Sequence, residues 1–290
     1  MAFEDVMGAV SRWAVSIEAA AALGAQLQLE QSGESAPPEI ASALRAVSEA
    51  GGLGDLGELA PPQRAIAAGL IQLYLHQAID LLNEPARASG WSFTDPVILD
   101  GWGRASTMVP GLISASVPTV GEVTSFLDVG TGVGLLAVAA ANLWPDCTIV
   151  GVDRWDTSLE RARAHVAGAG LGARIELRKQ DVVDVDDVDR FDLVWVPTFF
   201  LSEAVTAQAL PVLLRAMKPG GTIVLGIFNP PPDALAAAVS TLRTVRGGGE
   251  ELEAKRGLEL LEQAGFASVS TAQPPGPAPM SFVVGQKTAG

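Results

Sequence analysis

An apolar stretch in the middle of the chain is interrupted by three glycines at alternate positions. The stretch begins at Phe126 and reads FLDVGTGVGLLAVAAANLW. Gly130, Gly132 and Gly134 follow a run typical of a buried strand and precede a run typical of a helix. Glycine tolerates tight turns and lets the backbone approach a ligand beside a helix amino terminus. The pattern therefore predicts a strand–turn–helix unit that holds a small molecule at its turn.

Short β-branched runs alternate with helical stretches from about Val120 onward, which is typical of βαβ units around a parallel sheet. A proline-rich segment, QPPGPAPMS, joins the last two runs in place of a helix. We therefore expect a final hairpin and one reversal of strand direction at that edge. The seven expected strands span residues 125–129, 148–152, 175–179, 193–196, 222–227, 268–272 and 282–286.

The first 110 residues predict an all-helical region. Apolar residues recur at three- and four-residue spacing between Ala65 and Leu82. Turn-forming segments separate this helix from a shorter one at Glu39 to Ala50 and from an alanine-rich helix at the amino terminus. We expect a helical cap or lid at residues 1–110, which also pairs two chains into a homodimer, and an α/β core at residues 111–290.

Composition argues against several classes of protein. With 33 acidic against 19 basic residues and a net charge of −14, a nucleic-acid partner is not expected. The single cysteine, Cys147, excludes an internal disulfide, and without a Cys or His cluster no metal site is expected. The acidic amino terminus does not resemble a signal peptide, and we judge no apolar stretch to approach a membrane span of ~20 residues. We expect a soluble cytoplasmic protein with a small-molecule partner and no membrane contact.

The glycine pattern leaves two cofactor classes open. The dinucleotide pattern G-x-G-x-x-G fails when started at Gly130, because its last position is Leu135, but a shifted match from Gly132 ends acceptably at Ala137. Asp153 closes the second expected strand, where an acid can bind the ribose hydroxyls of either cofactor. NAD therefore stays open as an alternative.

Four segments in order resemble class I S-adenosylmethionine-dependent methyltransferases: LDVGTGVG, VGVDRWD, RKQDVVD and MKPGG. The resemblance is strong from Ser125 to Phe228 and extends to the carboxyl terminus through the final hairpin. It implies an α/β fold with a Rossmann-like seven-stranded sheet, an N-terminal helical cap, and S-adenosyl-L-methionine as the cofactor.

The same resemblance implies where the cofactor would lie. Its methionine part would follow Gly130–Gly134, its ribose would contact Asp153, and its adenine would lie near Trp155 and Asp181. Arg104, in DPVILDGWGRASTMVPG, is expected to reach the cofactor carboxylate with a charge-assisted bond. The predicted cofactor-binding residues are Arg104, Asp128, Gly130, Thr131, Gly132, Gly134, Asp153, Arg154, Trp155, Asp181, Val182 and Pro197.

The segment after the fourth strand, VWVPTFFLSEAV, predicts an apolar acceptor site at Trp195, Phe199 and Phe200. It contains neither the histidine base of some O-methyltransferases nor an N/D-P-P-Y-type motif. No catalytic residue is therefore assigned. His76 is a weak candidate, and His165 is expected on a solvated helix face.

We predict methyl transfer from S-adenosylmethionine to a hydroxyl or similar nucleophile of an apolar or aromatic small molecule, in secondary metabolism. Alignment of the two reactants would lower the barrier without a strong base. One alternative is a methyltransferase-fold protein with a non-methylating role, such as a cyclase or a binding partner. An NAD-dependent oxidoreductase is a second alternative, although the one tyrosine, Tyr74, lies in the helical region.

Overall fold

The computed structural model describes residues 2–276 and 279–288 of the 290-residue chain. Contacts divide it into a helical unit, residues 1–86 and 95–105, and a core unit, residues 87–94 and 106–290. Residues 87–94 therefore belong to the core unit, residues 95–105 belong to the helical unit again, and the rest of the chain belongs to the core unit. We call residues 87–94 the strap.

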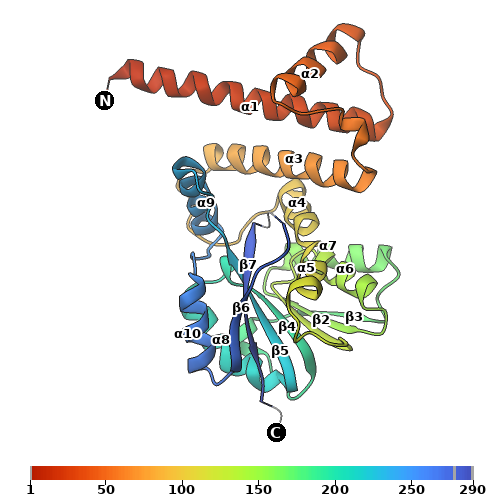
Figure 1. Cartoon of the computed structure of the whole chain (residues 1–290), viewed down its shortest axis with the longest axis vertical. Coiled ribbons are helices and arrows are strands. Elements are labelled where there is room, and N and C mark those ends of the chain that lie inside the picture. Colours follow the sequence, from red (N-terminus) through yellow and green to blue (C-terminus); the bar gives the residue numbers. More distant parts are fainter. Residues whose placement is uncertain (1, 277–278, 289–290) are drawn as a thin grey trace. The chain divides into compact units, whose positions relative to one another are not determined.

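The helical unit is built from helices, three of which begin at a proline. Its elements are α1 (Phe3–Ser32), α2 (Pro38–Ala50), the short 3-10 helix η1 (Leu56–Glu58), α3 (Pro61–Asn83) and α4 (Pro96–Ser106) (Figure 1). α1 packs against α2 and α3, with Gly24 and Leu27 buried, and ends at Gly33, which takes a left-handed conformation. The helices expected from the sequence at 39–50 and 65–82 are therefore present, each slightly longer than expected.

Two of these helices correct one expectation from the sequence. Within the described residues, α1 and α3 are each long and apolar enough to cross a membrane, by length and composition alone. The judgement that no apolar stretch approaches a membrane span was therefore wrong. The indication is weak, because core helices and signal sequences pass the same test.

The core unit contains the seven expected strands in one sheet. The strands are β1 (Ser125–Val129), β2 (Thr148–Asp153), β3 (Ile175–Lys179), β4 (Phe191–Pro197), β5 (Met217–Phe228), β6 (Ala267–Ala272) and β7 (Met280–Gln286). Their order is β3-β2-β1-β4-β5-β7-β6. β7 runs antiparallel to both of its neighbours, β5 and β6, and the neighbouring pairs from β3 to β5 are parallel. The predicted hairpin and reversal of direction are confirmed. The fold is the predicted Rossmann-like seven-stranded sheet preceded by helices.

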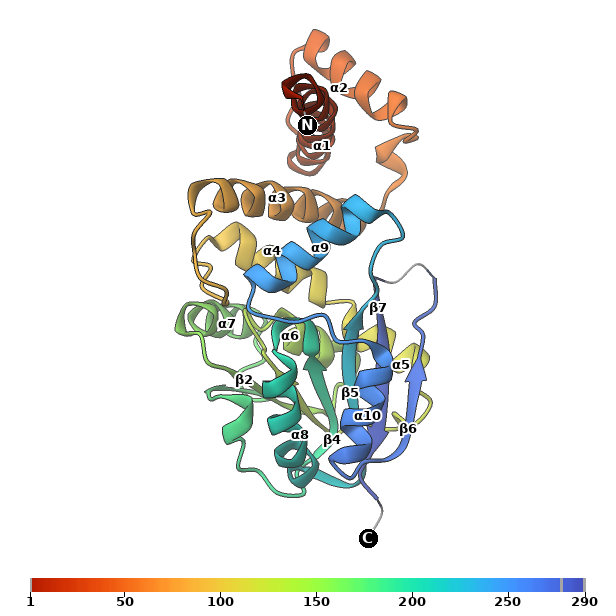
Figure 2. The same ribbon diagram turned by 90° about the vertical axis from the view of Figure 1, so that its left-hand side faces the viewer.

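Helices cover both faces of this sheet (Figure 2). α5, α6 and α7 pack around Phe126 on one face, and α8 and α10 pack around Leu127 on the other. Both faces are buried because successive side chains of a strand point in opposite directions. The remaining elements of the core unit are α5 (Val109–Ser116), α6 (Leu135–Leu143), α7 (Asp156–Gly168), η2 (Val182–Asp184), η3 (Thr198–Phe200), α8 (Glu203–Ala216), α9 (Ala234–Arg246) and α10 (Ala254–Gln263).

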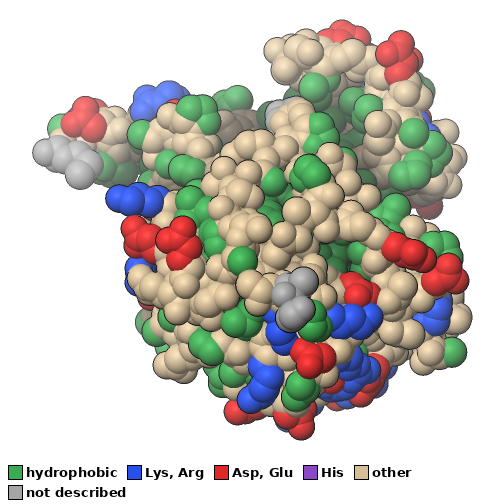
Figure 3. Space-filling view, turned by 60° about the horizontal axis from the view of Figure 1, so that its bottom comes forward, with side chains coloured by type: hydrophobic (Ala, Val, Ile, Leu, Met, Phe, Trp, Pro, Cys, Tyr) green, Lys and Arg blue, Asp and Glu red, His purple; other side chains and the backbone are tan. Residues whose placement is uncertain are grey.

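Several charged side chains of the core unit lie in pairs of opposite sign. Lys218 lies 2.8 Å from Asp192, and Arg178 lies 2.7 Å from Asp187. Figure 3 shows acidic and basic side chains interspersed over the lower face of the core. Within the described ranges, no group of three or more His, Cys, Asp or Glu residues is arranged to hold a metal ion.

Candidate cofactor and acceptor site

The sheet has a topological switch point between β1 and β4. From β1 the strand order runs outward through β2 and β3 on one side, and through β4 and β5 on the other. Ligands of open α/β sheets bind at the carboxyl ends of the strands beside such a point. The loop at Gly130–Gly134 follows β1 and the turn η3 follows β4, so both lie at this location.

The glycine loop has a backbone that suits glycine at all three alternate positions. Gly130, Gly132 and Gly134 have φ values of 65°, 54° and 76°, in the left-handed region. Gly134 caps α6, and a Cβ there would lie 3.1 Å from the Cβ of Ala162. The loop therefore presents its backbone at the start of α6.

Asp153 holds this loop to the end of β2. Its Oδ2 accepts a hydrogen bond from the Gly132 N–H at 2.9 Å, and its Oδ1 accepts one from the Trp155 N–H at 2.8 Å. Burial raises the pKa of Asp153, and these backbone bonds oppose the rise. The carboxylate has further lone pairs, so the predicted bond to a ribose hydroxyl is compatible with this geometry.

Asp128 and Thr131 support the loop from below. The Thr131 hydroxyl donates to Asp128 Oδ2 at 2.7 Å, and a Cβ at Gly151 would lie 2.6 Å from Thr131 Oγ1. Asp128 is 1% exposed. Its burial raises its pKa to about 7; the bond from Thr131 lowers the pKa, and the nearby charge of Asp153 raises it. The structure thus gives Asp128 a supporting contact inside the protein, and its contact with a cofactor stays a prediction.

The charge of the loop suits a cationic ligand better than an anionic one. Asp128 and Asp153 are neighbouring acids whose pKa values are both raised, and the Gly132 N–H is already donated to Asp153. A nearby positive charge would stabilise both carboxylates, whereas a pyrophosphate would repel them. S-adenosylmethionine carries a sulfonium and an ammonium group, so these residues fit it better than NAD.

Residues predicted around the adenine lie after β2 and β3. Arg154 and Asp181 form an ion pair at 3.4 Å, in which Arg154 is largely exposed. The indole N–H of Trp155 donates to the carbonyl oxygen of Phe93 at 3.1 Å. Val182 is 5% exposed, and its side chain belongs to the hydrophobic core of the sheet.

Aromatic side chains gather at the carboxyl ends of β4 and β5. Phe199 and Phe200 have ring centroids 4.8 Å apart, and Phe199 lies 5.4 Å from Phe228. Phe200 lies 5.0 Å from Trp91, which lies 5.2 Å from Phe93. We call these five residues the aromatic cluster. Trp91, Phe93 and Phe228 were not predicted as site residues. The motif GWSF, which places two aromatic residues between two helical segments, could have indicated Trp91 and Phe93.

Pro197 and Trp195 have different surroundings on β4. Pro197 is buried at the strand end, and its Cγ would lie 3.6 Å from a Cβ at Gly130, so it borders the glycine loop. Trp195 is 2% exposed, packs edge-on against Phe282, and fills the space above Gly226, where a Cβ would lie 2.3 Å from the indole. The structure therefore corrects the assignment of Trp195 to the acceptor site: the side chain packs in the core.

His165 is also corrected. It was expected on a solvated face, but its ring is half-buried and Nδ1 lies 2.8 Å from the carbonyl oxygen of Val133, within the glycine loop. Because a carbonyl only accepts, the Nδ1–H is the donor in this bond. His165 therefore helps α7 to hold the loop.

Arg104 and His76 belong to the helical unit. Arg104 lies on α4, with Nε 3.1 Å from where a Cβ at Gly69 would stand. Its predicted bond to the cofactor carboxylate stays a prediction. His76 Nδ1 lies 2.6 Å from Asp95 Oδ2. Burial raises the pKa of Asp95, but the bonds from His76 and from the Val97 N–H outweigh it and leave the pKa below its ordinary value.

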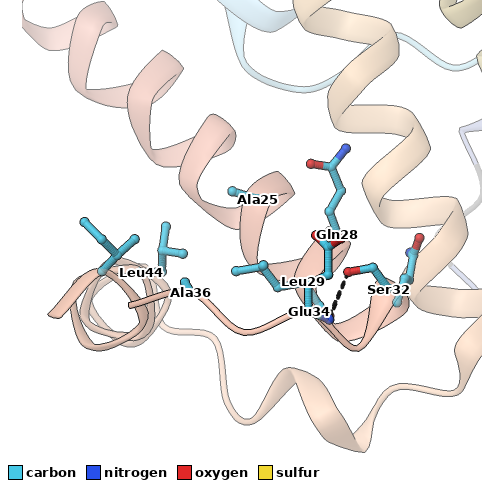
Figure 4. A pocket seen from close by; sticks show the side chains of 9 residues that line it. Ala25, Gln28, Leu29, Ser32, Glu34, Ala36 and Leu44 are labelled. Atoms are coloured by element: carbon cyan, nitrogen blue, oxygen red, sulfur yellow. Dashed lines mark hydrogen bonds between the residues drawn. The ribbon is translucent and has the colours of Figure 1, made fainter. Parts of the chain in front are cut away.

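An open groove of about 640 Å³ lies within the helical unit, between the end of α1 and the start of α2 (Figure 4). The Glu34 N–H donates to the Ser32 hydroxyl at its rim, at 3.2 Å. Glu34 is the one ionisable residue in its lining, so the groove does not offer paired acid–base groups. The lining residues are Ala25, Gln28, Leu29, Gln31, Ser32, Glu34, Ala36, Ile40 and Leu44.

Comparison with known proteins decides which family this geometry represents. A family described as "Methyltransferase domain" matches residues 126–221. Residues 126–221 are a methyltransferase domain. The matched range includes the glycine loop, Asp153, Asp181 and η3. The domain has the class I methyltransferase fold, and S-adenosyl-L-methionine is its cofactor.

Sequence relatives and solved structures agree with this assignment. A demethylmenaquinone methyltransferase from Clavibacter sepedonicus is 34% identical over 119 residues, 41% of this chain and 46% of that protein. The chain spans less than half the length of the curated relatives it matches. An O-methyltransferase family protein from Burkholderia thailandensis has the same fold over 100% of this chain and 99% of its own, at 15% identity and a TM-score of 0.69. Human N-acetylserotonin methyltransferase, solved with S-adenosylmethionine, matches over 98% of both chains, at 15% identity and a TM-score of 0.65.

Proposed function

We propose that the methyltransferase domain transfers the methyl group of S-adenosylmethionine to a hydroxyl group of an apolar, aromatic small molecule. The aromatic cluster carries this proposal, because the partly exposed rings of Trp91, Phe200 and Phe228 lie at the carboxyl ends of the strands with the buried rings of Phe93 and Phe199 behind them. The O-methyltransferase family protein of the same fold supports oxygen as the nucleophile. A role in secondary metabolism and a cytoplasmic location belong to the same proposal.

The residues of the chain would act by binding and alignment. When bound, the cofactor supplies a methyl carbon on a positively charged sulfur. It would give this methyl group to an acceptor oxygen and leave as S-adenosylhomocysteine, and the acceptor proton would pass to water. Asp153 and the glycine loop would fix the cofactor, and Phe199 and Phe200 would fix the acceptor. Alignment of this kind can supply ~7–11 kcal/mol of the barrier.

Titration calorimetry of the full chain with S-adenosylmethionine, its demethylated product S-adenosylhomocysteine, and NAD tests the cofactor. We expect both sulfur compounds to bind and NAD to give no heat of binding. Incubation with S-adenosylmethionine and a panel of phenols, followed by mass spectrometry, then tests the transfer. A gain of one methylene mass on a phenol supports the proposal, and NAD binding without binding of the sulfur compounds overturns it.

His76 is a second candidate for removing the acceptor proton, because Asp95 holds its ring nitrogen as a carboxylate does in catalytic pairs. In the proposal without a base, replacing His76 with glutamine leaves turnover within a few-fold of wild type. A loss of ~10²–10⁴-fold, with folding and cofactor affinity intact, would establish His76 as the general base. The pH dependence of turnover distinguishes the two cases, because a base-free reaction follows ionisation of the acceptor.

We further propose that two chains pair through α1. Exposed apolar residues recur along it at alternating spacings of three and four, which is the pattern of a coiled-coil seam. The exposed fractions are 73% for Phe3, 43% for Val6, 46% for Val10, 50% for Trp13 and 58% for Ile17. A membrane surface is a less suitable occupant, because residues 3–17 contain two acidic residues and one arginine, whereas interfacial helices are rich in Lys and Arg.

The double variant Val10→Glu, Trp13→Glu is expected to convert the dimer to a monomer, because it places charges within the proposed seam. Size-exclusion chromatography with light scattering measures the mass. Val15→Glu is the matched control, since Val15 is 67% exposed but lies off the stripe. A monomeric wild type, or a dimer that survives the double variant, would contradict the pairing.

A further inference from the structure

The strap joins two parts of the core unit that are far apart in sequence. At its start, the Ser89 hydroxyl donates to the Val245 carbonyl, and the Gly90 N–H donates to the Arg246 carbonyl at 3.2 Å. Near its end, the Phe93 carbonyl accepts the indole N–H of Trp155 at 3.1 Å. The strap therefore connects the end of α9 to Trp155, which lies just after β2.

The glycine run Gly247–Gly249 seats the strap closely. Gly248 has a φ of 85°, and a Cβ there would lie 2.8 Å from the Cα of Gly90. A Cβ at Gly249 would lie 2.0 Å from the carbonyl oxygen of Phe199. The backbone of the strap thus packs on Gly248, and the backbone of η3 packs on the next residue, Gly249. This explains the glycines at positions 248 and 249, for which the sequence motifs give no reason.

The side chains of the strap extend the same connection. Trp91 packs edge-on against Phe200, and Phe93 packs edge-on against Trp91. A continuous series of contacts therefore leads from Trp155, through Phe93 and Trp91, to Phe200. One end of this series is the predicted adenine neighbour, and the other is the predicted acceptor wall.

We infer that the strap is a positioning element that couples a cofactor contact at Trp155 to the position of Trp91 beside Phe200. The inference rests on the proposed function. The strap contains neither helix nor strand, so its position depends on these backbone and side-chain contacts. Cofactor packed on Trp155 fixes the indole, the indole N–H fixes the Phe93 carbonyl, and Trp91 becomes a fixed wall beside Phe200.

Hydrogen–deuterium exchange of the full chain, with and without saturating S-adenosylhomocysteine, tests this coupling and needs no acceptor. We expect the ligand to slow exchange in residues 128–134 and also in the strap, by about three- to tenfold, the range that one neutral hydrogen bond contributes. Trp155→Phe keeps an aromatic ring but lacks the N–H. In this variant we expect the glycine loop to remain protected by the ligand while the strap loses its protection.

Two matched controls separate coupling from general damage. Trp144→Phe removes an indole that packs on Phe126, with no part in the strap, so ligand protection of the strap is expected to remain. Gly248→Ala places a methyl group against Gly90 and is expected to leave the strap unprotected with or without ligand. Gly220→Ala carries the same backbone penalty, with a φ of 82° and open space around it, and is expected to behave as wild type.

The outcomes distinguish this inference from the proposed function. A protected glycine loop with an unchanged strap overturns the coupling alone. Equal protection of the strap in wild type and Trp155→Phe overturns it as well, because the indole N–H would then transmit nothing. No protection of the glycine loop at any ligand concentration overturns the proposed function and the coupling together.

Discussion

Replacing Asp153 with alanine is expected to weaken S-adenosylhomocysteine binding more than any other single change in the site. The variant loses the acceptor of the Gly132 and Trp155 N–H groups and the predicted acceptor of the ribose hydroxyls. Only the ribose bonds differ between the free and bound states, and each of two hydroxyl bonds to a charged carboxylate contributes ~1.5–3 kcal/mol. We therefore expect a loss of at least ~3 kcal/mol, or more than about a hundredfold in Kd, measured by titration calorimetry.

Asp156→Ala is the matched control for this variant. Asp156 lies three residues further on, in the exposed first turn of α7, where it pairs with Lys179 at the surface. Exposed pairs contribute ~0–1 kcal/mol, so cofactor affinity is expected to stay near that of wild type. Asp153→Ala with a Kd within threefold of wild type would show that the loop does not depend on this carboxylate.

Replacing Asp128 with asparagine is expected to change how stability depends on pH. The pKa of Asp128 is raised from 3.8 to about 7 in the folded protein. The protonated form therefore favours folding, and its contribution is complete below pH ~4 and is lost as the pH rises through ~7. The free energy of unfolding of wild type, relative to Asp128→Asn, should fall over this interval by an amount on the order of 3–4 kcal/mol.

Urea denaturation of both proteins at a series of pH values measures this difference. Asparagine retains an oxygen that accepts the Thr131 hydroxyl, so the comparison isolates the ionisation of the buried carboxyl. Other acids titrate in both proteins and cancel in the difference. A difference that does not change with pH, or that rises with pH, would contradict a raised pKa at this position.

The parts of the fold predicted best from the sequence are those whose local pattern is complete. β1 and β3 begin and end at the predicted residues, because each is a short run between turn-forming or polar neighbours. The glycine loop was recognised because its alternate glycines need a left-handed backbone that other residues rarely adopt. Asp153 was recognised by its position at the end of the next strand.

The parts that were missed depend on contacts between distant segments. Trp155 and Phe93 are 62 positions apart, so no local pattern links the strap to the site. Trp195 was placed in the acceptor site because it precedes a strand end, but the space that buries it is provided by Gly226 on the neighbouring strand. His165 was placed on the surface because its sequence neighbours are charged, although its partner, Val133, lies 32 positions earlier.

The long reach of the strap also has a consequence for synthesis on the ribosome. Ser89 contacts Val245, 156 positions later, whereas the last residue of the helical unit is Ala105. Chains elongate at ~5–20 residues per second and fold from the amino terminus as domains are completed. The helical unit can thus form while the strap waits, for roughly 8–30 seconds at that speed, for its partner on α9. Phe93 lacks Trp155 and Trp91 lacks Phe200 during the first part of this interval, so a nascent-chain chaperone would find its apolar target there.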